Sequence, residues 1–176
     1  MKRMSLIITF ALLSGRTCFA DVVVEPFVGL SQIVFTEVSN TGGGDNDEAA
    51  NGFHVGARLG FGFFKKLIFG GEYFQGGPYK DLDNADETTT VRQIGLFVAY
   101  DFIGIRLSAA YYPYSRLDED QGGDEEGKAI RVGMALPIKS KKFLANLDVT
   151  IFPSFDTDEN ARAQNAMVSL SFPLDF

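Results

Sequence analysis

The sequence contains one cysteine, one histidine and no tryptophan. The cysteine, Cys18, lies among the first 20 residues, so a chain that starts at Asp21 can form no internal disulfide. After the N-terminal segment, no apolar run is long enough to cross a bilayer as a helix. Any part of the chain that spans a membrane is therefore expected to consist of strands.

The first 20 residues have the parts of a cleaved secretory signal peptide. Lys2 and Arg3 form a positive start, residues 4–13 form an apolar run, and the small residue Ala20 precedes the expected cleavage site. The residues before Cys18 lack the leucine and small residues that precede a lipidated cysteine. We expect a signal peptide at 1–20 and a single domain at 21–176.

Removing residues 1–20 takes away three basic residues and no acids, which leaves 13 basic and 23 acidic residues. The mature chain is therefore strongly acidic, which argues against a nucleic acid as partner. An exported chain without disulfides needs another source of stability, and a closed hydrogen-bonded barrel in lipid would supply it.

Eight segments carry apolar side chains at alternate positions, the pattern of strands that bury one face. They lie at residues 22–36, 52–63, 67–76, 90–101, 105–115, 128–138, 143–153 and 165–176. Most are about 9–11 residues long, as a tilted strand that crosses the hydrocarbon core must be. Long polar loops are expected at 37–51, 77–89, 116–127 and 154–164, and short turns at 64–66, 102–104 and 139–142. Long loops on one rim and short turns on the other are typical of outer-membrane barrels.

The two faces of each strand differ in bulk. In segment 52–63, one face carries mostly large apolar residues from Phe53 to Phe63, and the other carries His54, Arg58 and four glycines. A soluble barrel needs an apolar interior, whereas this pattern places small and charged residues inside and the bulky face in lipid. Aromatic residues near the strand ends, Phe53 and Phe152 among them, are expected to form girdles at the two membrane interfaces. The sequence predicts an all-β fold: an eight-stranded antiparallel up-and-down transmembrane β-barrel.

Two stretches resemble a known family. Residues 24–30 (VEPFVGL) are similar to the first strand of the small outer-membrane β-barrel superfamily, which includes the OmpA transmembrane domain and OmpX/Ail-like proteins. The end of the chain resembles the C-terminal insertion signal of these barrels, with Leu170, Phe172, Leu174 and Phe176 at alternate positions. The resemblance implies location in the cell outer membrane, periplasmic chaperones and the outer-membrane insertion machinery as folding partners, and a monomer.

Charged residues on the inward faces are expected to form ion pairs in the lumen, since a buried charge is costly unless it is paired. A short turn at 64–66 places Arg58 opposite Glu72, and a turn at Lys139-Ser140 would place Arg131 opposite Asp148. Arg106 also points inward. These pairs would form either a gate or a plug, and the narrow lumen of an eight-stranded barrel favours the plug.

Cations at the bases of the long loops could meet the phosphates of lipopolysaccharide, or they could be ordinary snorkelling residues. They are Lys80, Arg92, Arg116, Lys128 and Arg162. The loops themselves are rich in acid, but none fits a calcium-loop pattern, so neither a metal nor another cofactor is expected.

The only histidine, His54, lacks the His-x-Ser arrangement of lipid A-modifying barrels, because position 56 is glycine. An enzyme is therefore not expected. The sequence favours a structural or interaction role at the cell surface with a closed lumen. A small pore or transporter for solutes is the alternative, and a lipid A-modifying enzyme is the third possibility.

Overall fold

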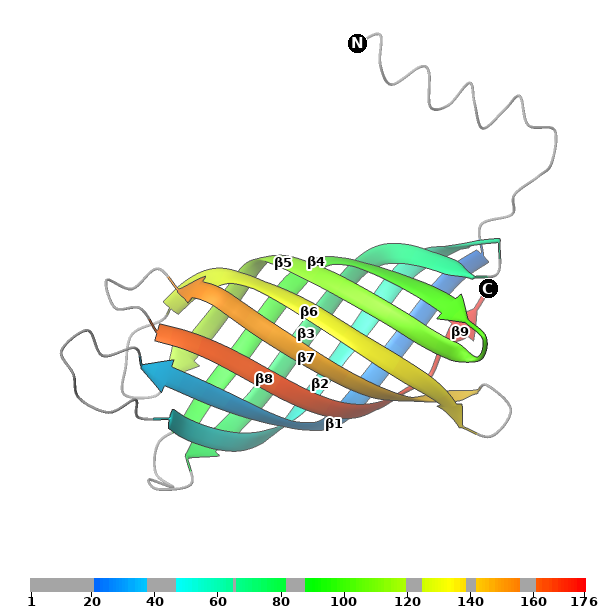
Figure 1. Ribbon diagram of the computed structural model, residues 1–176. Helices are drawn as coiled ribbons and strands as arrows, with labels where there is room; N and C mark the ends of the chain where they lie inside the picture. Colours follow the sequence, from blue (N-terminus) through cyan, green and yellow to red (C-terminus); the bar gives the residue numbers. More distant parts are fainter. Residues whose placement is uncertain are drawn as a thin grey trace, which may run out of the picture.

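The computed structural model describes residues 21–37, 47–64, 66–81, 88–119, 125–138, 142–155 and 161–176. The proposed signal peptide lies outside these residues and stays a prediction. The described chain forms eight long strands and one very short one, joined in a single antiparallel sheet (Figure 1). The strands are β1 (Asp21–Glu37), β2 (Asp47–Phe63), β3 (Leu67–Asp81), β4 (Thr88–Phe102), β5 (Ile105–Glu119), β6 (Glu125–Ile138), β7 (Phe143–Phe155), β8 (Ala161–Ser171) and β9 (Leu174–Asp175).

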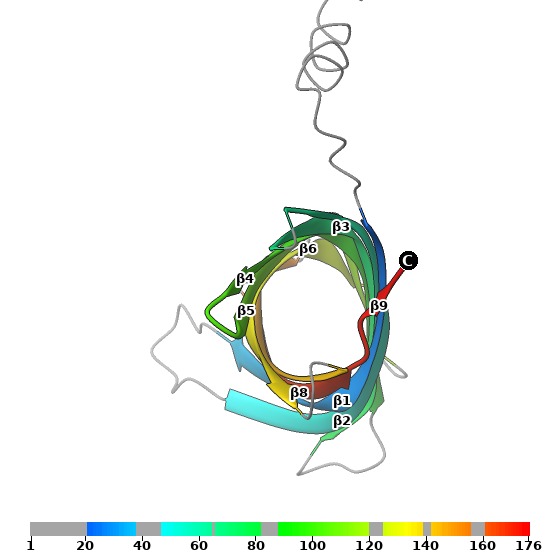
Figure 2. The same cartoon turned by 90° about the vertical axis from the view of Figure 1, so that its right-hand side faces the viewer.

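Each strand pairs with its neighbour in the chain, and β1 pairs with both β2 and β8, so the sheet closes on itself. Viewed along its axis, the sheet forms a ring (Figure 2). Closure gives every long strand two partners, so the long strands have no open edge of the kind that hydrocarbon would not tolerate. The predicted eight-stranded antiparallel barrel is confirmed. No described helix is long and apolar enough to cross a membrane.

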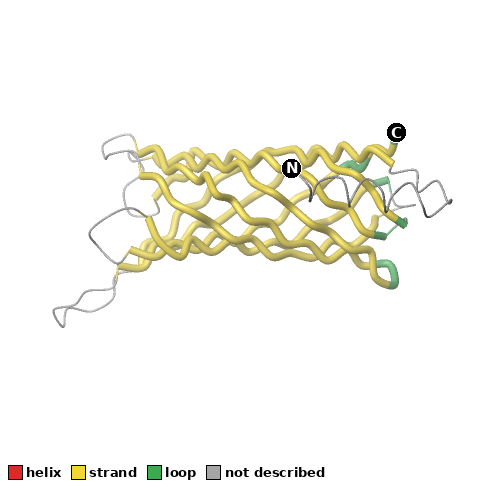
Figure 3. Tube along the Cα trace, turned by 90° about the horizontal axis from the view of Figure 1, so that it is seen from above, coloured by secondary structure: helices red, strands yellow, loops and turns green. Residues whose placement is uncertain are grey.

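The strands extend further at the long-loop rim than the sequence predicts. Strands β1 and β2 each contain 17 residues. Only residues 38–46, 82–87, 120–124 and 156–160 remain between the strands at that rim, and they lie outside the described part of the chain. The predicted boundaries were wrong because the apolar alternation in the sequence ends before the backbone ladder does. The described turns lie at the opposite end of the barrel (Figure 3).

The last predicted strand is interrupted. Strand β8 ends at Ser171, and β9 begins after Pro173 and pairs with β1 alone. Proline has no N–H to donate to the ladder, so it breaks the strand locally. The backbone N–H of Phe172 instead donates to the carbonyl of Pro26 at 3.0 Å, which keeps the end of the chain on the barrel.

The outer face is bulky and apolar as predicted, but the inner face carries large side chains such as Phe74 and Phe97 beside its small and polar residues. In β4, buried and exposed side chains alternate from Val91 to Tyr100. In β8, Asn165, Met167, Ser169 and Ser171 are buried, whereas Val168 and Leu170 are exposed on the outside. The core of the protein is therefore its lumen, and side chains fill the ring that the ribbons leave open in Figure 2.

Candidate functional site: the lumen and the outer surface

A chain of alternating charges crosses the lumen. It links seven side chains in the order Asp101, Arg106, Glu25, Arg58, Glu72, Arg131 and Asp148. These residues come from β4, β5, β1, β2, β3, β6 and β7, so every long strand except β8 contributes one. Because each charge touches its opposite, the network offsets the cost of removing these groups from water.

Glu72 is the centre of the chain. The Nε of Arg58 donates to Oε2 of Glu72 at 2.7 Å, and an Nη of Arg131 donates to the same oxygen at 2.5 Å. The hydroxyl of Tyr112 donates to the other carboxylate oxygen. The Glu72 side chain is 0% exposed. Three donors on one buried carboxylate tie β2, β5 and β6 to β3 through the lumen.

Glu25 forms the second junction, towards the short-turn end. Its two oxygens accept from Arg58 at 2.6 Å and from Arg106 at 2.7 Å. Arg106 also makes a two-pronged contact with Asp101, at 2.7 and 3.1 Å. Asp101 is part-exposed, so the charge chain begins near the rim and becomes fully buried at mid-barrel.

The structure brings all five predicted lumen charges into this chain, but one predicted register is wrong. Arg58 lies directly opposite Glu72. Arg131 lies opposite Thr150, and Asp148 lies opposite Gly133. The ladder starts at Ile138 with Phe143, so the connection spans four residues rather than the two assumed. The long Arg131 side chain still reaches Asp148, with 3.5 Å between Nη1 and Oδ1.

Sequence reasoning missed Glu25, Asp101 and Tyr112. Glu25 could have been found, because it is an isolated acid on the same face of its strand as Phe27, Gly29 and Ser31. Tyr112 carried no comparable signal, because nothing in its segment distinguishes it from the tyrosines that face lipid.

A tightly packed layer fills the lumen on the long-loop side of the charge chain. Its apolar members are almost fully buried: Ile33, Val91, Leu117 and Phe152. Tyr79 joins them, and its hydroxyl shares hydrogen bonds with Ser31 at 2.9 Å and Asn165 at 3.0 Å. The sequence placed Phe152 in an aromatic girdle. That prediction was wrong, since Phe152 is 0% exposed and points inward.

His54 packs between two aromatic rings inside the barrel. Its ring centroid lies 6.1 Å from that of Phe27 and 5.4 Å from that of Phe74. Its Nδ1 has no hydrogen-bond partner. A general base needs a hydrogen bond to its nucleophile, and this packing does not supply one at Nδ1. Among the described residues, no group of three or more His, Cys, Asp or Glu side chains could hold a metal ion.

The predicted phosphate-binding cations face outward where the structure describes them. Lys80, Arg92 and Lys128 are exposed, Arg116 is half-buried, and the side chain of Arg162 lies outside the described part. Arg92 of β4 is directly opposite Arg116 of β5. Asp118 contacts both, at 3.7 Å from Arg92 and 2.5 Å from Arg116. The carboxylate allows two like charges to sit side by side.

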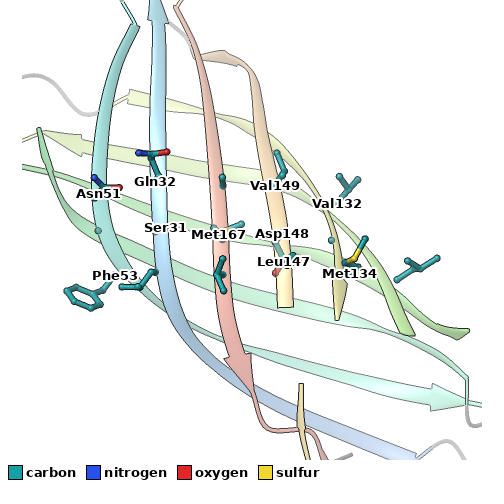
Figure 4. A pocket seen from close by; sticks show the side chains of 16 residues that line it. Ser31, Gln32, Asn51, Phe53, Val132, Met134, Leu147, Asp148, Val149 and Met167 are labelled. Carbon is teal, nitrogen blue, oxygen red and sulfur yellow. The ribbon is translucent and has the colours of Figure 1, made fainter. Parts of the chain in front are cut away.

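A shallow pocket of about 990 Å³ lies across β2, β1, β8, β7, β6 and β5 (Figure 4). Most of its large apolar side chains are exposed on the outer face, including Leu30, Phe53, Met134 and Leu147. Gln32 and Asn51, which pair across β1 and β2, are the polar side chains on its outer face. Ser31, Asp148 and Met167, which are buried on the inner face, also line the pocket, so its lining comes from both faces of the barrel wall.

No family model matches this sequence, and no curated protein matches it. Solved structures do match. Neisserial surface protein A (NspA) is 18% identical, with 84% of this chain and 96% of that chain covered and a TM-score of 0.51. Ail, the attachment invasion locus protein of Yersinia pestis, is 11% identical, with 86% and 98% covered and a TM-score of 0.60. A second Ail structure, in complex with the heparin analogue sucrose octasulfate, has a TM-score of 0.54 at 12% identity, with 88% and 99% covered.

These likenesses span nearly the whole length of each solved chain, and at such low identities they concern the fold. The closed antiparallel sheet agrees with them. The chain has the fold of the small eight-stranded outer-membrane β-barrels, as seen in NspA and Ail.

Proposed function

We propose that this chain is an integral protein of the outer membrane with a closed lumen and a structural or interaction role at the cell surface. The observation that carries the proposal is the filling of the lumen. The charge chain from Asp101 to Asp148 spans seven of the eight long strands, and a packed apolar layer lies beyond it. A barrel of eight strands has little interior room beyond its side chains.

A small solute pore is the alternative, and one observation favours it. Several buried polar atoms in the lumen have no hydrogen-bond partner, among them Arg58 Nη2, Arg131 Nε and Thr150 Oγ1. Such atoms are commonly satisfied by internal water. A conducting path would need that water to continue past Ile33, Leu117 and Phe152, whose buried apolar side chains offer it no hydrogen bond.

The wild-type barrel in a planar lipid bilayer is therefore expected to give no steady conductance. Replacing both Leu117 and Phe152 by alanine should produce measurable current, because it removes bulk from the layer that interrupts the polar interior. Val149→Ala, on the outer face, serves as the matched control and should stay silent. Steady current through the wild-type protein would replace the closed-lumen model with the pore.

We further propose that the outward cations at the long-loop rim bind the phosphates of lipopolysaccharide. Arg92 and Arg116 lie side by side on β4 and β5, and Lys128 faces outward on the adjacent β6. Ile94 and Tyr114, exposed on the outer face, lie one step towards the apolar belt. Guanidinium groups just above an apolar belt are placed to form charge-assisted hydrogen bonds to phosphate. Lys80 and Arg162 would extend this basic band.

Removing two of these charges should weaken lipopolysaccharide binding. A cation near a charged lipid surface contributes about 1 kcal/mol, so Arg92→Ala with Arg116→Ala should reduce affinity by roughly thirtyfold. The effect should diminish at high salt. Affinity is measured by titrating purified lipopolysaccharide into the barrel folded in detergent. Val149→Ala, on the outer face away from both rims, is the control. Equal affinity in both variants would mean that Arg92 and Arg116 do not bind phosphate and only extend their charged ends from the apolar belt to water.

The proposal includes folding partners in the periplasm. Leu170, Phe172, Leu174 and Phe176 all lie exposed at the end of the chain, on the strand pair that closes the barrel. We infer that this apolar row serves as the insertion signal, presented to the outer-membrane insertion machinery after delivery by periplasmic chaperones.

A further inference from the structure

Two short turns of the barrel carry a bulky apolar residue in an unfavourable backbone conformation. Phe64, in the turn between β2 and β3, has φ of 53°, and Ile103, in the turn between β4 and β5, has φ of 47°. Left-handed backbone is rare for residues with a side chain, and for a β-branched residue it is a true outlier. Ile103 is followed by Gly104 with φ of 83°, a two-residue turn in which Asn, Asp or Gly is strongly preferred at both positions.

Folding of the barrel does not explain these residues. Ile103 is 86% exposed and Phe64 is 79% exposed, so neither contributes to the core. Asparagine adopts a left-handed backbone at lower cost, and its polar side chain is better solvated by water. Strained residues that persist without a packing role point to a function outside the fold.

The two turns form one apolar edge. The backbone N–H of Asp101 donates to the carbonyl of Lys66 at 2.8 Å, which links the two neighbouring hairpins at this rim. Phe102 and Ile105, on either side of the Ile103 turn, are exposed on the outer face. The turn tips therefore extend the lipid-facing belt past the ends of the strands.

Charges of both signs lie beside this edge: Asp21, opposite Gly62, and Asp175, opposite Val23, are exposed on this rim together with two lysines. Lys66 is exposed next to Phe64, and Lys142 is exposed at the turn before β7 on the same rim. Asp101, the acid next to the tips, is bound by Arg106. Apolar side chains flanked by lysines are typical of protein surfaces that lie in the headgroup region of anionic bilayers.

We propose that Phe64 and Ile103 form a membrane anchor that inserts into the anionic phospholipid leaflet on the short-turn side of the barrel. This inference rests on the proposed outer-membrane location and names the lipid that this rim contacts. The apolar tips enter the leaflet, and the nearby lysines bind its phosphates. The favourable transfer of the tips into lipid offsets the unfavourable turn conformation.

The absence of tryptophan makes a direct test possible, because an introduced tryptophan is the only one in the chain. Ile103→Trp reports on the tip, and Leu59→Trp reports on the outer belt at mid-strand. Each variant is folded into phosphatidylcholine vesicles with and without phosphatidylglycerol, and brominated lipids quench any tryptophan in contact with them. Both reporters should be quenched, and the tip more strongly when phosphatidylglycerol is present.

If Leu59→Trp were quenched but Ile103→Trp were not, the turn tips would lie in water and the anchor proposal would be wrong. The apolar rim would then be better explained as a contact surface for a periplasmic protein. An unquenched belt would instead contradict the proposed function itself. The variant Phe64→Asn with Ile103→Asn gives an independent readout. In detergent it should unfold at the same or higher urea concentration than wild type, because asparagine suits both turns. Its association with phosphatidylglycerol vesicles should fall at least about tenfold. Association equal to wild type would overturn the proposal.

Discussion

Replacing Glu72 by alanine is expected to lower the free energy of unfolding by about 3–5 kcal/mol, the usual cost of breaking a buried ion pair from one side. The substitution leaves Arg58 and Arg131 in the lumen without the carboxylate that they share. It also removes the acceptor of the Tyr112 hydroxyl. Urea unfolding of the barrel in lipid vesicles, followed by circular dichroism, measures the change.

Two further variants show whether charge or shape is responsible. Glu72→Gln keeps the size of the side chain and one acceptor for Tyr112 but removes the charge, so its loss should fall between wild type and Glu72→Ala. Asp21→Ala, an exposed acid at the start of β1, should change stability by less than about 0.5 kcal/mol. If Glu72→Ala left both unfolding and bilayer conductance unchanged, the charge chain would not be what closes and stiffens the lumen.

The architecture could be predicted from the sequence because lipid and lumen make opposite demands on one strand. Segment 52–63 alternates large apolar residues with His54, Arg58 and glycine, and this alone distinguishes inside from outside. The same signal fails near the long-loop rim, where the outer face is no longer a continuous apolar row although Tyr79 and Leu117 are still buried inside the barrel. For that reason the predicted strands ended too early, and the ladder of β1 and β2 continues to Phe35–Glu48 and Thr36–Asp47.

The lumen could be predicted only where one short turn fixes the register. Between β2 and β3 the turn is tight, so the pairing of Arg58 with Glu72 follows from counting residues. Between β6 and β7 the sequence does not show how many residues lie outside the ladder. The predicted partner of Arg131 is therefore two residues away from the observed one. Contacts across the barrel, such as Arg106 with Glu25 or Tyr112 with Glu72, depend on how strands far apart in sequence are staggered. No local pattern encodes that stagger.

The second large effect is expected at Phe152. This residue is fully buried in the apolar layer of the lumen, and Phe152→Ala should lower the free energy of unfolding by about 3–5 kcal/mol. Part of the loss is the transfer of the removed ring, and the rest comes from the cavity that it leaves. The surrounding layer, with Ile33 and Leu117, is held by the closed hydrogen-bonded wall and cannot collapse to fill that space.

Phe53→Ala is the matched control because it removes the same ring from the outer face, where Phe53 is 66% exposed. Acyl chains fill the space that this ring leaves, so only the transfer free energy of about 1.5–3 kcal/mol is lost. Both variants are compared with wild type in the same vesicles by urea unfolding. A larger loss at Phe152 than at Phe53 supports a packed lumen. Equal losses would mean that lumen and lipid are equally able to close over a missing ring, as expected of an interior that is loose enough to admit solutes.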